Sequence, residues 1–200
     1  MKSKIMSMML VAALALASFS LMGCEPSIQQ GPKVTDTDGN VYPSVKIGNQ
    51  IWMAKNLNVN VPGSVCYGNS SAHCEKYGRL YTWETAKKAC PAGWHLPSKD
   101  EFEMLLATVG ASPKERSKYL RAGSWENGAN KFGFSALPAG FYFSDLKKFN
   151  YVGYSAHFWS STESFTIHAH ILGIPAGRSA FVSSSDKSDA SSVRCLQDSN

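Results

Sequence analysis

The sequence lacks the short motifs that mark several common classes of enzyme and metal-binding protein. It contains no Gly-x-Ser-x-Gly nucleophile elbow, no phosphate-binding loop and no zinc-protease string. It also shows no internal repeat and no coiled-coil heptads. Asp36-Thr-Asp-Gly-Asn40 carries its glycine in the fourth place, whereas an EF-hand calcium loop needs it in the sixth, so we expect a turn there. We therefore expect no catalytic site, no cofactor and no dedicated metal site.

Positive charge is too sparse for a nucleic-acid-binding protein. The chain has 20 basic and 15 acidic residues. Loss of an N-terminal signal with Lys2 and Lys4 leaves 18 basic and 15 acidic residues, a net charge of +3. These charges are scattered and form no basic stripe. We expect no nucleic-acid partner.

Long apolar runs are absent except at the N-terminus. Ile5 to Met22 carries no charge and follows a basic start, which is typical of a secretory signal. Leu21-Met-Gly-Cys24 is similar to a lipoprotein signal-peptidase site, with Cys24 as the lipidated residue. We predict a signal peptide over 1–23 and a lipidated, Pro- and Gln-containing tether over 24–33. The alternative is an uncleaved membrane helix.

Cysteine is scarce, with five residues in the chain. If Cys24 carries lipid, including palmitate, four cysteines remain for the domain that we predict over 34–198. An exported chain favours disulfides over free thiols, and four cysteines allow three pairings. Cys66 and Cys74 bracket a turn-rich segment. Cys90 ends a predicted helix and has Cys195 as its distant partner. We predict Cys66–Cys74 and Cys90–Cys195; the second bond closes a loop of about a hundred residues, worth roughly 4–5 kcal/mol.

Helical patterns occupy the middle of the chain. Apolar spacing over 83–90 predicts a helix that Pro91 ends. A Ser-x-x-Glu capping box starting at Ser98 opens a second helix, which stops at Gly110. A third, short helix is expected within 112–123.

Strand patterns flank these helices. Asp38-Gly39 and Gly48-Asn49 predict two hairpins before the helices. Further strands are expected at 132–138, 158–162, 165–172, 179–182 and 192–196, with a polar turn over 183–190. This order predicts an α+β fold with two to three helices and mostly antiparallel short strands.

Seven strings along the domain occur together. They are Asp-Thr-Asp-Gly-Asn-Val-Tyr42, Val-Lys-Ile-Gly-Asn-Gln-Ile-Trp-Met-Ala-Lys-Asn-Leu57, Tyr-Gly-Arg-Leu-Tyr-Thr-Trp83, Cys-Pro-Ala-Gly-Trp-His-Leu-Pro-Ser98, Gly-Phe-Ser-Ala-Leu-Pro-Ala-Gly140, Phe-Trp-Ser-Ser-Thr-Glu163 and Ser-Val-Arg-Cys195. In this order they resemble the Fibrobacter succinogenes major paralogous domain family of secreted and surface proteins. The resemblance covers nearly all of 34–198.

The resemblance implies a C-type-lectin-like fold, in which a helical cysteine pairs with one in the last strand. This agrees with the Cys90–Cys195 pairing. Sugar-binding C-type lectins hold calcium with a Glu-Pro-Asn or Gln-Pro-Asp string together with a Trp-Asn-Asp string. The sequence contains none of these, and after Trp159 it has Ser160 and Ser161 where a carboxylate or amide would be needed. The fold also hosts formylglycine-generating enzymes, which need reactive cysteines that the predicted disulfides would use. We expect neither activity.

One histidine pair and one single histidine remain as candidates. His168 and His170 lie two apart on a predicted strand, so their rings would share a face and could begin a zinc site with His157 or Asp186. We favour a polar, solvent-facing strand and leave metal binding open. His95, within a tight turn, is expected to be packed and hydrogen-bonded.

One segment is rich in aromatics, with six in the fourteen residues 141–154. Aromatic side chains among polar neighbours can stack on sugar rings or form a protein-binding hot spot. We expect Phe141 and Phe143 in the core. The remaining candidates for a ligand-binding face are Tyr142, Tyr151 and Tyr154, helped by Trp125.

The sequence therefore favours a lipid-anchored binding or adhesion module of the cell envelope, without catalytic activity and with a glycan or an envelope protein as ligand. We expect attachment to the outer membrane through the lipid, facing the periplasm or the surface. The alternatives are a structural envelope lipoprotein that contacts proteins only, and an exported enzyme with an unrecognised site. A shared fold does not decide between them.

Overall fold

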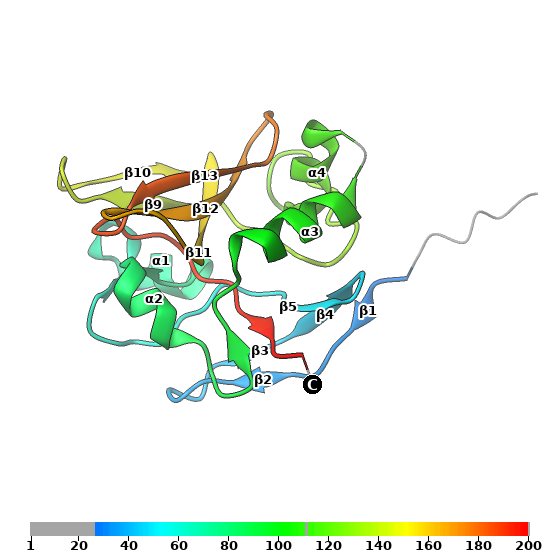
Figure 1. Cartoon of the computed structure of the whole chain (residues 1–200), viewed down its shortest axis with the longest axis horizontal. Coiled ribbons are helices and arrows are strands. Elements are labelled where there is room, and N and C mark those ends of the chain that lie inside the picture. The colour runs from blue at the N-terminus through cyan, green and yellow to red at the C-terminus, as the bar shows by residue number, and fades with distance from the viewer. Residues whose placement is uncertain (1–26, 111, 200) are drawn as a thin grey trace, which may run out of the picture.

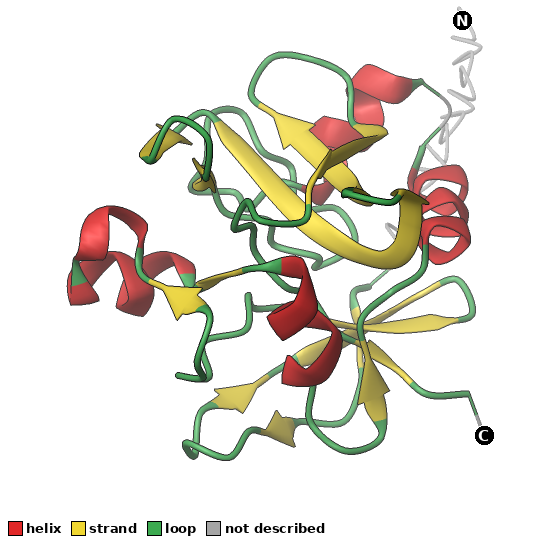
Figure 2. Ribbon diagram, turned by 60° about the vertical axis from the view of Figure 1, so that its left-hand side comes forward, coloured by secondary structure: helices red, strands yellow, loops and turns green. Residues whose placement is uncertain are grey.

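The computed structural model describes residues 27–110 and 112–199, so the predicted signal peptide and Cys24 lie outside the described residues. The described chain is α+β, as predicted, with two five-stranded sheets and two two-stranded ones. Figure 1 shows one large sheet above helix α3 and the other below it. Figure 2 shows the same two groups of strands with the helices around them.

The first sheet has the order β1-β4-β5-β14-β8 and is antiparallel throughout. Its strands are β1 (Gln29–Gln30), β4 (Ser44–Ile47), β5 (Gln50–Met53), β14 (Leu196–Gln197) and β8 (Trp94–His95). The hairpin predicted at Gly48-Asn49 joins β4 and β5. Pairing of β1 with β4 means that part of the segment expected as a tether is docked on the sheet.

The second sheet has the order β10-β9-β11-β12-β13. Its strands are β9 (Ala139–Phe143), β10 (Lys148–Val152), β11 (Ser155–Phe165), β12 (His168–Pro175) and β13 (Phe181–Asp186). All its pairs are antiparallel except β9 with β11, which are parallel at Gly140 and Ala156. The small sheets pair β2 (Val34–Thr35) with β3 (Val41–Tyr42) and β6 (Ser64–Val65) with β7 (Leu80–Tyr81).

Four α-helices lie in the described residues, one more than expected. They are α1 (Ser71–Tyr77), α2 (Trp83–Ala89), α3 (Lys99–Val109) and α4 (Pro113–Leu120), with a short 3-10 turn over Tyr67–Asn69. The last three match the predicted helices, although α4 ends before the predicted Gly123. Helix α1 was missed because residues 66–74 are rich in turn formers; the Cys66–Cys74 disulfide, with sulfurs 2.04 Å apart, joins its first turns to the chain before it.

The predicted strand at 132–138 is wrong. The chain there forms no strand; Ala136 instead exchanges backbone hydrogen bonds with Leu120 and Ala122, just after α4. The strand β9 begins only after Pro138, which has no N–H to donate to a sheet.

The strands at the end of the chain also differ from the prediction. The strand expected over 165–172 is interrupted, since the chain reverses between Phe165 and His168, which pair with each other. The turn expected over 183–190 is partly strand, because Ser183 to Ser185 pair with β12. The last strand does not join β13; Leu196 lies between Trp52 and His95 in the first sheet.

Helix α3 packs between the two large sheets. Its capping box is complete: the Glu101 N–H donates to Ser98 Oγ at 3.2 Å, and the Ser98 N–H donates to Glu101 Oε2 at 2.7 Å. Phe102 stacks on Trp52 of β5 with ring centroids 5.5 Å apart. The main core joins α3 with side chains from β4, β5, β11 and β12. This core fixes the second sheet, whose outer face carries the site described below.

A buried arginine ties distant loops to the last strand. Arg194 is fully buried, and its guanidinium donates to the carbonyls of Met53 and Phe134 and to Asn56 Oδ1. It also lies over the Phe134 ring, 4.5 Å from the centroid. Burial lowers the pKa of Arg194 to about 9, but the carbonyl partners offset part of the cost of burying the charge. The Arg of the Ser-Val-Arg-Cys string is therefore a core residue.

The second predicted disulfide is also present. Cys90 and Cys195 are bonded with sulfurs 2.06 Å apart and span 105 residues. Both predicted pairings are confirmed. Two disulfides are consistent with an exported protein.

Candidate functional site

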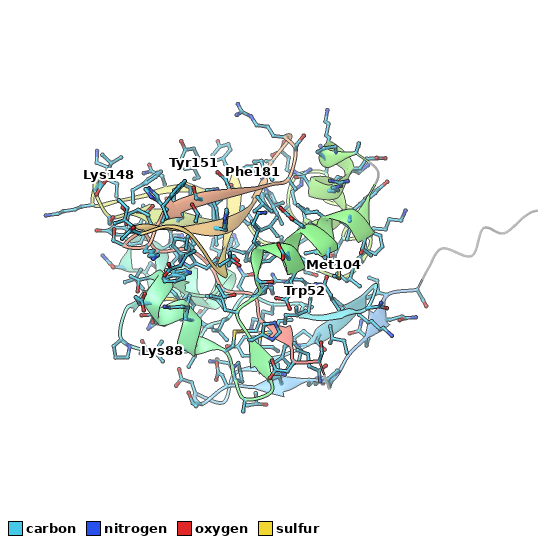
Figure 3. The ribbon with its side chains drawn as sticks, viewed as in Figure 1. Trp52, Lys88, Met104, Lys148, Tyr151 and Phe181 are labelled. Carbon is cyan, nitrogen blue, oxygen red and sulfur yellow. A yellow bond between two sulfur atoms is a disulfide. The ribbon has the colours of Figure 1, made fainter. Side chains whose placement is uncertain are left out.

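A groove of about 880 Å³ lies on the outer face of the second sheet. Its aromatic walls come from distant parts of the sequence. They are Tyr67 from the 3-10 turn, Phe141 and Phe143 from β9, Phe149 and Tyr151 from β10, Tyr154 from the β10–β11 turn, and Phe181 from β13. Figure 3 shows Tyr151 and Phe181 along the same upper edge of the molecule. The volume is within the range of small-molecule sites.

Three rings form a stacked column across neighbouring strands. Phe141 lies between Tyr151 and His157, with centroid distances of 5.4 Å and 4.1 Å and interplanar angles of 9° and 17°. Strand order β10-β9-β11 brings these residues side by side. Phe143 meets Phe141 at 4.5 Å with rings inclined by 66°. The packing between the rings fixes their orientation, so the groove is pre-formed.

Tyr151 reaches the surface from an unusual backbone conformation. Its φ angle is +65°, in the left-handed region that tyrosine rarely adopts. The neighbours of Tyr151 pair regularly with β9, Asn150 with Phe141 and Val152 with Ala139, so Tyr151 lies opposite Gly140. A Cβ atom at Gly140 would come within 2.4 Å of the Asn150 carbonyl oxygen. The result is a large aromatic ring that is 55% exposed.

His157 contributes a polar atom to an otherwise apolar wall. Its ring packs between Phe141 and Phe181, whose centroid is 6.3 Å away. The Nδ1 atom is shielded from solvent and has no hydrogen-bond partner among the described residues. Burial lowers the pKa of His157 to about 4, so the ring is neutral at physiological pH.

The groove has a positive electrostatic bias. Among the described residues that line it, none is acidic and one, Arg178, is a cation. Arg178 lies in the turn between β12 and β13 and makes no ion pair within the described chain. Asn150 and Ser155 add polar groups. The arrangement suits a neutral or negatively charged ligand with an apolar face.

A family comparison identifies the domain. The model of the Fibrobacter succinogenes major domain matches residues 45–197. The chain belongs to this family. Neither the comparison with curated proteins nor that with solved structures finds a match. The lectin-like architecture that the resemblance implies therefore stays a prediction.

The strings that identify the Fibrobacter succinogenes major domain mostly build its core. Trp83 Nε1 donates to the Ser160 carbonyl at 2.8 Å, and Trp159 Nε1 donates to the Tyr81 carbonyl at 2.7 Å. Asp36 accepts from the hydroxyl of Tyr42 and from the side chain and backbone N–H of Asn40, which confirms a turn at this position. Most side chains of the groove lie outside these strings.

Two of the four predicted aromatic binding residues lie in the groove. Tyr151 and Tyr154 line it, the latter 70% exposed. Tyr142 points to the other face of β9, where it packs on Phe149 at 4.9 Å between centroids. Placing Trp125 at the binding face is wrong: the side chain is only 4% exposed and lies in the main core, with the Arg121 guanidinium 5.5 Å from its ring.

Sequence reasoning missed several groove residues, among them Arg178. Phe143 was expected in the core but lines the groove, whereas Phe141 is buried and still forms part of the wall. His157 and Phe181 were not connected with the aromatic segment. The alternation of Phe141 and Phe143 with Tyr142 could have indicated which aromatics share a face.

The other candidates assemble no centre in the described chain. His168 pairs with Asp186 in the register of β12 and β13, while His170 Nδ1 is 3.2 Å from the Ser183 carbonyl. No group of three or more His, Cys, Asp or Glu side chains that could hold a metal gathers within residues 27–110 and 112–199. None of the helices in the described part is both long and apolar enough to cross a membrane.

Proposed function

We propose that this protein is a lipid-anchored binding module of the cell envelope that holds a glycan in its aromatic groove and carries out no catalysis. The observation that carries the proposal is the stacked column of Tyr151, Phe141 and His157 beside the exposed Tyr154. Such rings present flat, apolar surface at little entropic cost, and a sugar ring has an apolar face that can pack on them. Polar atoms at the rim then give orientation.

The proposed anchor is lipid on Cys24 at the outer membrane, after removal of residues 1–23. It is supported by the basic start, the apolar run and the Leu-Met-Gly-Cys24 string. Mass spectrometry of the N-terminal peptide tests it. A lipidated Cys24 in the native chain and an unmodified, unprocessed chain for Cys24→Ser are expected; an intact N-terminus in the native protein contradicts it.

A glycan array probed with the full chain in detergent tests the binding role. Native protein is expected to bind at least one class of glycan, and Tyr151→Ala and Tyr154→Ala are expected to lose most of that binding. Tyr119→Ala, a partly exposed tyrosine on α4 outside the groove, is the control. No binding to any glycan, or binding that survives both groove substitutions, contradicts this proposal.

One other surface favours the alternative of a protein-contacting envelope lipoprotein. Phe165 and Ile167, at the reversal between β11 and β12, are 74% and 60% exposed. Exposed apolar side chains at a hairpin end are suited to contact with a partner protein. A photo-crosslinker at Phe165 that captures one defined envelope protein, together with a blank glycan array, would favour this role. Turnover of any substrate that is lost in His157→Phe would instead revive the enzyme alternative.

A further inference from the structure

We propose that the glycan bound by the groove is acidic, with its sugar ring against Tyr151 and Tyr154 and its carboxylate on Arg178. This inference rests on the proposed function and narrows it from glycans in general to uronate-containing polysaccharides. The juxtaposition that supports it is one guanidinium, without an ion-pair partner in the described chain, that lines an aromatic groove with no acidic lining residue.

Charge complementarity is the first argument. Several acidic side chains elsewhere on the domain have a basic partner: Glu101 and Asp198 are paired with His95, and Glu163 with Lys187. Arg178 has no such partner in the described chain, yet it lines the groove. A guanidinium binds a carboxylate through two parallel hydrogen bonds, a geometry that an uncharged sugar cannot use. The groove thus favours an anion over a neutral ring.

The shape of the site is the second argument. Tyr151 keeps its exposed ring at the cost of a left-handed backbone conformation, and Gly140 supplies the space for it. Strained residues that persist in a fold concentrate at functional sites. The column behind Tyr151 prevents the ring from turning inward. An exposed, stacked ring in a groove that also contains a cation matches a ligand with both an apolar face and a carboxylate on the same ring.

The hydrogen-bonding groups are the third argument. The amide of Asn150 and the hydroxyl of Ser155 line the groove. Sugar hydroxyls both donate and accept, so they can serve amide and hydroxyl groups alike. A free fatty acid has the carboxylate but not the hydroxyls, and leaves these groups unsatisfied. A uronate meets all three features of the groove.

The test compares uronate oligosaccharides with their own methyl esters, which keep the rings and hydroxyls but lose the charge. Oligomers of galacturonate, mannuronate and glucuronate are titrated calorimetrically against the full chain in detergent. At least one acid is expected to bind about tenfold or more tightly than its ester, since hydrogen bonds to charged groups are worth more than neutral ones. Binding of the acid is expected to weaken as salt rises.

Variants separate the two contacts. Arg178→Gln is expected to weaken the acid about tenfold and leave the ester unchanged. Tyr151→Ala is expected to weaken both. Lys88→Gln removes the same charge from an exposed site on α2, away from the groove, and is expected to change neither (Figure 3). Arg178 is exposed in a turn, so thermal unfolding is expected to show Arg178→Gln folded like the native chain.

The outcomes distinguish this inference from the proposed function. Equal binding of acid and ester, an acid preference that survives Arg178→Gln, or tight binding only of neutral glycans overturns the uronate assignment and leaves the glycan-binding module standing. Tighter binding of an acidic peptide than of any uronate, lost in Arg178→Gln, overturns the sugar assignment as well. Failure of every acidic and neutral glycan to bind overturns both.

Discussion

Two histidines of this domain respond to protonation in opposite ways. Burial against Phe141 lowers the pKa of His157 to about 4. The pKa of His95 is raised: burial lowers it, but hydrogen bonds to Asp198 and Glu101, at 2.6 Å and 3.0 Å, outweigh that effect. His95 therefore favours the folded state below its ordinary pKa and loses that contribution as pH rises through the raised value. His157, whose pKa is lowered, favours the folded state above its ordinary pKa and loses that contribution as pH falls toward about 4.

The lowered pKa of His157 can be tested with the variant His157→Phe. Unfolded His157 binds protons at pH values between its ordinary 6.5 and about 4, whereas the folded protein does not. The native chain should therefore lose about 2 kcal/mol of unfolding free energy from this residue between pH 7.5 and 4.5. Urea unfolding at both pH values is expected to show a smaller loss for His157→Phe. An unchanged loss would contradict the burial of a neutral ring.

The backbone of Tyr151 provides a second test at the residue scale. Glycine normally destabilises a strand relative to alanine by about 0.5–1 kcal/mol. At Tyr151 the order should reverse, because φ is +65° and only alanine carries the strain: Tyr151→Gly is expected to be about 1 kcal/mol more stable than Tyr151→Ala. The same pair at Asn150, which is outside the positive-φ set, is the control in urea unfolding. If the alanine variant is more stable than the glycine variant at both positions, the backbone of Tyr151 is not strained.

At the scale of elements, the start of α3 is hydrogen-bonded to strands of both large sheets. Ser98 and Glu101 satisfy each other's backbone N–H groups, and Glu101 also holds His95 of β8. The chain after Ser98 is tied to β11, because the Lys99 N–H donates to Thr162 Oγ1 at 3.0 Å. The cap therefore joins the helix to both large sheets.

Ser98→Ala is expected to lower the unfolding free energy by about 1 kcal/mol, since it leaves the Glu101 N–H without its acceptor. Ser98→Asp keeps an acceptor and should recover most of the loss. Ser183→Ala on exposed β13 is the control and should change little. Chemical denaturation measures all three; equal values for the Ser98 and Ser183 alanine variants would show that the cap contributes nothing.

At the scale of the whole molecule, the Cys90–Cys195 bond joins the end of α2 to the residue before β14. It closes a loop more than ten times longer than that of Cys66–Cys74, with separations of 105 and 8 residues. The longer loop restricts the unfolded chain more. The two disulfides should therefore differ in their contribution to stability.

Replacing Cys90 and Cys195 together by alanine is expected to cost about 4–5 kcal/mol, against about 2–3 kcal/mol for the Cys66 and Cys74 pair. Unfolding in urea under non-reducing conditions compares the double variants with the native chain. Adding reductant to the native protein should reproduce the sum of both losses. A larger loss for the short loop would contradict the chain-entropy account.

Local patterns alone determined much of this protein. The Ser-x-x-Glu box predicted the start of α3, Pro91 the end of α2, and cysteine spacing both disulfides, because each depends on residues or constraints that are visible along the chain. The family strings identified the domain, and the structure shows that several of their residues, Arg194 among them, lie in the core.

Tertiary structure alone decided the face that each aromatic presents. Trp125 and Tyr151 were both predicted for the ligand-binding face, but Trp125 is buried in the core and Tyr151 is exposed in the groove. Phe141 joins His157 and Phe181 only because β9, β11 and β13 belong to one sheet. Long-range strand pairing and burial determine these positions, and neither can be predicted from the spacing of residues that are close in the sequence.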